Sequence, residues 1–224
     1  MKTTGLIGGI GPETTVIYYR LLIAAGHTRI VINSIESGRL VPLVVRQDLP
    51  AVADFLAAEI ERLASAGADV GIIAGNTPHM CFPELERRSP IALVSIVQAT
   101  AEHMAGRGMR RAVLFGTRMT MEGRFFPDVF TAHGIELVVP ADDERTFIHD
   151  TYMGELFTGD IRAETKERLL AIVDAMAARE RLDAVILGGT ELSLILTEAE
   201  HNGIPLIDTT RIPIDAALAR AGAR

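Results

Sequence analysis

Two kinds of hydrophobic pattern alternate along the chain. Short apolar runs without polar alternation occur at residues 70–74 and 184–187, and each is followed by glycine. Such runs are typical of strands covered on both faces, so they predict largely parallel sheets. Longer segments with a helical period, at residues 51–66 and 165–177, precede these runs. Their apolar stripes, which we expect to face the core, are Val52, Phe55, Leu56, Ile60 and Leu63 in the first and Leu169, Ile172, Val173 and Met176 in the second.

The strand and helix pattern occurs twice. Residues 68–77 align without gaps on residues 182–191, which sets Gly75 over Gly189. Residues 6–9 likewise resemble residues 113–116, and residues 90–94 resemble residues 204–208. We therefore predict an α/β fold of two duplicated, pseudo-symmetric domains with mainly parallel sheets, each running strand, helix, strand, helix, strand. The expected bounds are residues 1–97 plus 206–224 for the first domain and 98–205 for the second, with one site in the cleft between them.

Composition and charge narrow the class of protein. The chain has 224 residues, 48% of them hydrophobic, and a formal net charge of −7. The negative charge argues against nucleic acid or an anionic membrane surface as a partner. Apolar runs are shorter than the roughly 18 residues of a membrane span, and the first residues lack a signal-peptide pattern, so we expect a cytoplasmic protein. The single cysteine, Cys81, and the scattered histidines predict neither a disulfide nor a metal site.

Four motifs together resemble the aspartate/glutamate racemase family. They are the opening Gly-Leu-Ile-Gly-Gly-Ile-Gly-Pro-Glu-Thr-Thr of residues 5–15 with Tyr18 and Tyr19, Asn-Thr-Pro-His at 76–79, Gly116-Thr117 with Thr-Met-Glu-Gly at 120–123, and Gly-Thr-Glu at 189–191. The resemblance covers nearly the whole chain. It implies two pseudo-symmetric α/β domains around the substrate and a homodimer. It also implies proton transfer at the α-carbon of an acidic amino acid, without pyridoxal phosphate or another cofactor, by two cysteines on opposite sides of that carbon.

The positions that correspond to the two family cysteines are Gly75 and Gly189. Glycine cannot exchange a proton, and a general acid or base contributes about 10² to 10⁴-fold to a rate. His79 and Glu191 are the remaining candidates to move protons. Alternatively, His79 supports the turn and Glu191 is a carboxylate at the start of a helix. We expect Cys81 to be a buried packing residue.

Polar residues that follow the predicted strands are candidates to bind a substrate carboxylate. Backbone amides at helix N-termini suit such an anion, although the same residues could simply cap their helices. The candidates are Gly9 and Gly11 in the opening turn, Asn76 and Thr77, Thr117 and Thr120, and Thr190. Arg46 follows an apolar run at the predicted end of another strand and could hold a carboxylate in a two-pronged contact. Its alternatives are an ion pair with Asp48 or a surface position.

The sequence leaves several functions open. The glycine-rich opening partly mimics a dinucleotide fingerprint, but Glu13 and the Thr14 in place of the third glycine argue against it. The leading hypothesis is an isomerase that racemises acidic amino acids with substitutes for the thiols. The alternatives are a lyase or decarboxylase on the same scaffold, and an inactive carboxylate-binding paralogue or cysteine-to-glycine variant. In each case the expected partner is a small carboxylate or amino acid.

Overall fold

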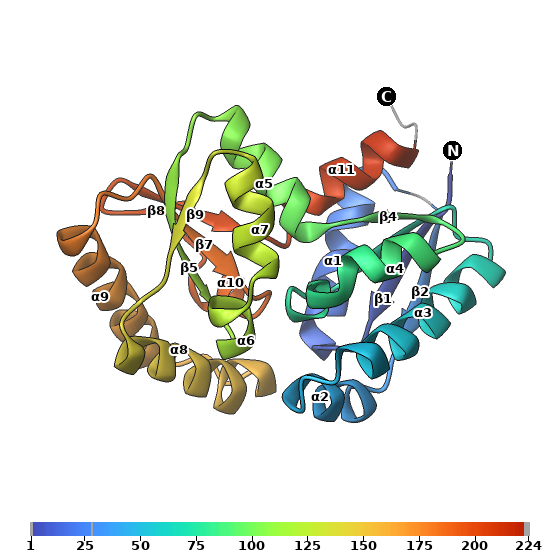
Figure 1. Cartoon of the computed structure of the whole chain (residues 1–224), viewed down its shortest axis with the longest axis horizontal. Coiled ribbons are helices and arrows are strands. Elements are labelled where there is room, and N and C mark those ends of the chain that lie inside the picture. Colours follow the sequence, from blue (N-terminus) through green and yellow to red (C-terminus); the bar gives the residue numbers. More distant parts are fainter. Residues whose placement is uncertain (1, 28, 222–224) are drawn as a thin grey trace. The chain divides into compact units, whose positions relative to one another are not determined.

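The computed structural model describes residues 2–27 and 29–221, which divide into two compact units (Figure 1). The first unit takes the chain up to Ala99 and again from Thr210, and the second is Thr100–Thr209. The chain first crosses inside helix α5 (Ile96–Gly106) and crosses back after strand β9 (Ile204–Asp208). The bound predicted at residue 205 falls inside β9, which pairs with the second unit's sheet and so stays in that unit.

The first unit contains a parallel sheet of four strands in the order β2-β1-β3-β4. These strands are β1 (Thr4–Gly8), β2 (Ile30–Ser34), β3 (Val70–Ile73) and β4 (Ala92–Val94). Leu6 at the centre of β1 lies opposite Ile32 on one side and Ile72 on the other. Strand β2 is not among the strands that the sequence predicts for this half.

Helices cover both faces of this sheet. They are α1 (Pro12–Ala24), α2 (Ser37–Val45), α3 (Leu49–Ser65), the short 3-10 helix η1 (Thr77–Cys81), α4 (Phe82–Arg88) and α11 (Ile212–Ala221). Neighbouring residues of β1 point to opposite faces, as strand geometry requires. Ile7 packs in the cluster of α3 and α4, whereas Leu6 packs in the cluster of α1 and α11. The sheet is therefore the middle of three layers.

The second unit repeats this topology. Its strands β5 (Arg111–Gly116), β6 (Glu136–Val138), β7 (Ala184–Gly188) and β9 run in parallel in the order β6-β5-β7-β9, and β8 (Glu200–His201) adds an antiparallel edge. The order matches that of the first unit, with β5, β6, β7 and β9 in the places of β1 to β4. Both sheets are mainly parallel, as the unbroken apolar runs predict.

The helices of the second unit are α6 (Arg118–Glu122), α7 (Phe125–Ala132), α8 (Asp142–Gly154), η2 (Leu156–Thr158), α9 (Ala163–Arg179) and α10 (Leu192–Ile195). Side chains of α8, α9 and α10 share one core cluster with Phe115 of β5 and Leu187 of β7. The predicted stripe of α9 is buried in this cluster. In α3 the stripe is buried except for Phe55, which packs partly buried against its cluster.

One predicted strand is wrong. The apolar run before Arg46 forms the end of helix α2, with Leu40 buried and Leu43 and Val44 packed against the core of α3 and α4. A short apolar run does not by itself distinguish a strand from a buried helical turn, and Pro42 inside the run does not stop this helix.

Candidate functional site

The four motifs found in the sequence lie at the carboxyl ends of two adjacent strands in each sheet, β1 and β3 in the first unit and β5 and β7 in the second. From β1 the chain first adds β2 on one side and then crosses to β3 on the other, and β5, β6 and β7 do the same. In open α/β sheets, ligands bind at the carboxyl ends of strands at such a switch in strand order. The turns after β1 and β3, and those after β5 and β7, are therefore the candidate site elements of the two units.

The turn after β1 is built around its glycines. Gly9 has a φ of +78°, and a Cβ there would overlap the carbonyl oxygen of Ile35, so only glycine fits. The Gly9 amide donates to Thr15 Oγ1 at 2.8 Å, and this hydroxyl in turn donates to the carbonyl of Gly11 at 3.4 Å. Since Thr15 engages the Gly9 amide within the turn, the glycines serve the turn itself, which weakens the dinucleotide alternative.

The turn after β3 has room for a side chain at Gly75. A Cβ on Gly75 would lie 3.2 Å from Ile10 Cδ1 and 3.5 Å from Pro78 Cδ. The first contact is with the far end of a flexible side chain, so a small shift of Ile10 would admit it. Asn76 is buried in this turn and Thr77 begins η1. The position of the first family cysteine is thus open.

His79 fastens this turn to the start of α5. Its Nε2 accepts the amide of Ile96 at 3.0 Å, so the proton is on Nδ1, which donates to the carbonyl of Gly75 at 2.9 Å. The ring also stacks on Phe82, with the centroids 5.0 Å apart. Burial lowers the pKa of His79 to about 4. The imidazole is neutral with both nitrogens engaged, which favours the supporting role over proton transfer.

Cys81 lies at the end of η1, inside the core. Its thiol donates to the carbonyl of Pro78 at 3.3 Å, and it packs in the cluster that contains Leu85. Burial raises the pKa of the Cys81 thiol to about 11. A thiol is a good nucleophile or base only as the thiolate. These observations agree with the packing role expected for Cys81.

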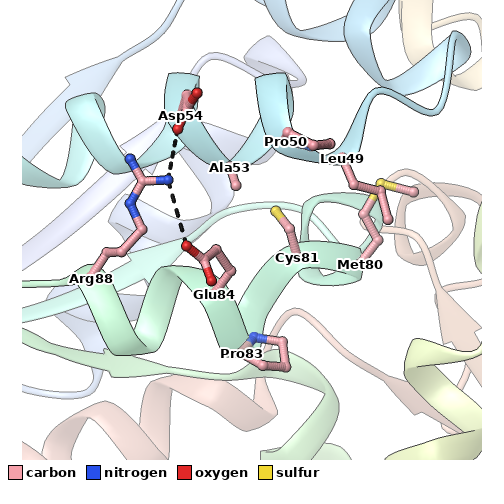
Figure 2. A pocket seen from close by; sticks show the side chains of 9 residues that line it. All are labelled: Leu49, Pro50, Ala53, Asp54, Met80, Cys81, Pro83, Glu84 and Arg88. Atoms are coloured by element: carbon pink, nitrogen blue, oxygen red, sulfur yellow. Dashed lines mark hydrogen bonds and ion pairs between the residues drawn. The ribbon is translucent and has the colours of Figure 1, made fainter.

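Figure 2 shows a pocket of about 580 Å³ beside this cysteine. Arg88 lies at its edge, paired with Asp54 at 2.7 Å and with Glu84 at 3.8 Å. The other lining residues are Leu49, Pro50, Ala53, Met80, Cys81 and Pro83. The pocket is framed by α3, η1 and α4, and its charged groups are paired with one another.

The turn after β5 holds Thr117 and Thr120. Thr117 Oγ1 accepts the amide of Thr120 at 3.3 Å and lies 3.1 Å from its hydroxyl, so Thr117 caps α6. The helices that follow the turns after β3, β5 and β7 are short: η1 and α6 have five residues each and α10 has four. Few aligned peptide units add to a dipole in such helices. Any carboxylate there would depend on individual amides and hydroxyls.

The turn after β7 contains a buried polar cluster of three side chains. The Tyr152 hydroxyl, which comes from α8, donates to Glu191 Oε2. The Thr190 hydroxyl donates to the same oxygen at 2.7 Å. Each of the three residues is at most 7% exposed. Burial, and then the charge of Glu191, raise the pKa of Tyr152 well above its usual value, so the phenol keeps its proton at neutral pH.

The ring of Tyr152 fills the space beside Gly189. A Cβ on Gly189 would overlap this ring and would lie 2.9 Å from both Cζ and the hydroxyl oxygen. The second family cysteine position is therefore closed by a tyrosine from another element. The sequence analysis missed Tyr152, because it lies on a helix whose buried face reads as ordinary core. No spacing along the chain connects it to Gly189.

Arg46 is not at a strand end. It follows α2 as the C-terminal cap residue and its side chain is exposed. Asp48, considered as its ion-pair partner, instead caps α3 by accepting the amide of Ala51 at 3.2 Å. The surface alternative fits this placement best.

The described part of the chain comprises residues 2–27 and 29–221. Within that part of the chain, His, Cys, Asp and Glu side chains do not gather in threes or more as a metal site would require. Helices in the same part also lack the combination of length and apolarity that crossing a membrane takes.

Comparison with known proteins agrees with the motifs. A family model described as Asp/Glu/Hydantoin racemase matches residues 7–217. A candidate Asp/Glu racemase from Yersinia pestis is 30% identical, with 99% of each chain covered and a TM-score of 0.88. An aspartate racemase homologue from Pyrococcus horikoshii is 29% identical, with 99% of each chain covered and a TM-score of 0.82. The Picrophilus torridus aspartate racemase, 23% identical over 100% of this chain and 96% of its own, shares the fold with a TM-score of 0.80. This chain, with its two-unit α/β fold, therefore belongs to the Asp/Glu/hydantoin racemase family.

Proposed function

We propose that this protein binds a small amino acid through its carboxylate and exchanges the proton on the α-carbon. The observation that carries the proposal is the Tyr152–Glu191 pair beside Gly189, because it sets an exchangeable proton at the carboxyl end of β7. Family membership and the similarity to proteins described as aspartate racemases support an acidic amino acid as the substrate. The leading function is isomerisation of such a substrate.

Hydroxyl and amide groups of the strand-end turns would hold the carboxylate. We assign this role to Asn76, Thr77, Thr117 and Thr120, which were named from the sequence, whereas the hydroxyl of Thr190, also named there, donates to Glu191 Oε2. Thr117 can cap α6 and still present its hydroxyl, because an oxygen accepts and donates at once. That the turns of both units act on one substrate stays a prediction, as do the homodimer and the cytoplasmic location.

A second candidate is one-sided chemistry, as in a lyase or decarboxylase. Racemisation needs a proton carrier on each face of the α-carbon. In the described part of the first unit, the titratable groups nearest Gly75 are poorly suited to this work. Burial lowers the pKa of His79 and keeps the imidazole neutral, both of its ring nitrogens are hydrogen-bonded to the backbone, and the Cys81 thiol is buried with a raised pKa. The second unit thus offers a proton carrier, the Tyr152–Glu191 pair, and the groups near Gly75 in the first unit do not. This difference favours a reaction that needs a proton carrier on only one face of the α-carbon.

Proton NMR in heavy water separates these functions. The purified protein is incubated with the L- and D-forms of aspartate and glutamate and with simple dicarboxylates, and loss of the α-proton signal is followed together with optical purity. Exchange with loss of optical purity supports a racemase. Exchange with retained configuration, or release of CO₂ or a fragment, supports one-sided chemistry. If every compound keeps its α-proton, the enzymatic proposal is wrong and a binding protein remains.

A further inference from the structure

The structure contains a buried acid pair that no motif in the sequence indicates. Tyr152 and Glu191 come from α8 and from the turn after β7, and they meet at the one strand end where a side chain at position 189 is excluded. A phenol hydrogen-bonded to a carboxylate can pass a proton along that bond. Its oxygen lies 2.9 Å from where the Cβ of residue 189 would be. The pair thus occupies the space of the missing side chain.

We propose that the Tyr152 phenol is the group that exchanges the substrate α-proton in the second unit, with Glu191 as the store for the proton. This proposal rests on the proposed function and names the residue that carries it out. Glu191 acts through Tyr152, and the Thr190 hydroxyl positions the carboxylate of Glu191 by donating a hydrogen bond to its Oε2.

The relay balances in protons and electrons. The substrate Cα–H bond breaks and its electron pair stays on the carbon, delocalised into the adjacent carboxylate. The α-proton forms a new O–H bond on the Tyr152 oxygen while the original phenol proton moves to Glu191 Oε2. The negative charge of Glu191 passes to the substrate, and reversal of both transfers returns a proton to the carbon. No oxidant, reductant or metal takes part.

The phenol of Tyr152 is better suited to a proton relay than to the role of a free base. Burial keeps it protonated at neutral pH, so it accepts the α-proton only as it releases its own to Glu191. The ring is also fixed, since Tyr152 packs in the core cluster of β5, β7 and α9. A fixed group spends little entropy on reaching the reacting geometry.

The test compares Tyr152→Phe with Tyr18→Phe. Both substitutions remove one hydroxyl from a buried tyrosine, but Tyr18 lies in the core of the first unit. In the NMR exchange assay we expect Tyr152→Phe to lower kcat by about 10² to 10⁴-fold with KM changed only a few-fold, because a general acid or base acts in the transition state. Tyr18→Phe should exchange at the wild-type rate.

Glu191→Gln is the second variant, which keeps the side-chain volume and protects the test if Tyr152→Phe does not fold. It should lose kcat to a similar extent, and the double variant should lose no more than either single one, because the two groups act as a unit. Wild-type exchange with an unchanged kcat in folded Tyr152→Phe, or in Glu191→Gln, overturns the relay and leaves the proposed function standing. Additive losses also overturn it. Absence of exchange in the wild type overturns both.

Discussion

The imidazole of His79 is kept neutral by its burial. One ring nitrogen accepts a backbone amide and the other donates to a backbone carbonyl, and burial lowers its pKa to about 4. In the unfolded chain the same group titrates near 6.5. Below 6.5 the unfolded state therefore binds a proton that the folded state refuses until about pH 4. The stability contributed by this group is full above 6.5 and is lost as the pH falls toward 4.

We expect His79→Gln to flatten the pH dependence of stability in this window. The lowered pKa of His79 corresponds to a loss of about 3 kcal/mol in the free energy of unfolding between pH 7 and pH 4. Urea unfolding at a series of pH values measures it, and the variant should be less stable at neutral pH but lose less on acidification. His27→Gln measures how much of the same trend comes from His27, because burial lowers the pKa of this histidine as well. An equally steep acid loss in His79→Gln would contradict the lowered pKa of His79.

At the scale of elements, helix α8 closes the turn after β7. The ring of Tyr152 fills the space that a Cβ on Gly189 would take, whereas at the corresponding position in the first unit, Gly75, the atoms nearest to such a Cβ belong to Ile10 and Pro78. The two repeats therefore differ in what packs on the turn although their strands follow the same order.

This difference predicts unequal effects of two alanine substitutions. Gly189→Ala should lower the free energy of unfolding by about 1–3 kcal/mol, because the new methyl group overlaps a fixed ring. Gly75→Ala should stay within about 1 kcal/mol of the wild type, since the end of Ile10 can shift and alanine restricts the unfolded chain. Chemical denaturation of the two variants gives the comparison. Equal losses would mean that Tyr152 does not fill the space beside Gly189.

For the whole molecule, racemisation in the family manner depends on a thiol from each unit. The sequence resemblance implies cysteines at positions 75 and 189, but the structure has room for a side chain only at position 75. If both thiols are restored, the one at position 189 has no space, because the ring of Tyr152 occupies it. The obstacle is a residue of α8, distant in sequence from both positions.

We expect Gly75→Cys with Gly189→Cys to show no racemisation of aspartate or glutamate. Adding Tyr152→Ala removes the ring and should bring racemisation to a measurable rate, which chiral chromatography would detect. The matched control is Tyr152→Ala alone, which should not racemise. Racemisation by the double cysteine variant above the wild-type rate, without Tyr152→Ala, would show that the ring of Tyr152 moves aside to admit a side chain at position 189.

The sequence by itself determined the local and repeated features. Unbroken apolar runs indicated parallel strands, helical stripes indicated the α3 and α9 faces, and the gapless match around Gly75 and Gly189 indicated duplication, which the equal strand order supports. These properties follow from periodicity within a short window and from comparison of the chain with itself. Cys81 as a packing residue followed from its apolar neighbours.

Only the tertiary structure decided which side chains from other elements contact the residues at each strand end. The sequence could not show that the ring of Tyr152, from α8, fills the space beside Gly189. Nor could it show that the backbone amide of Ile96 donates to Nε2 of His79. It also placed Arg46 after a strand instead of a helix. The physical reason is the same in each case. Contacts between residues far apart in the chain leave no periodic trace, and only packing determines their partners.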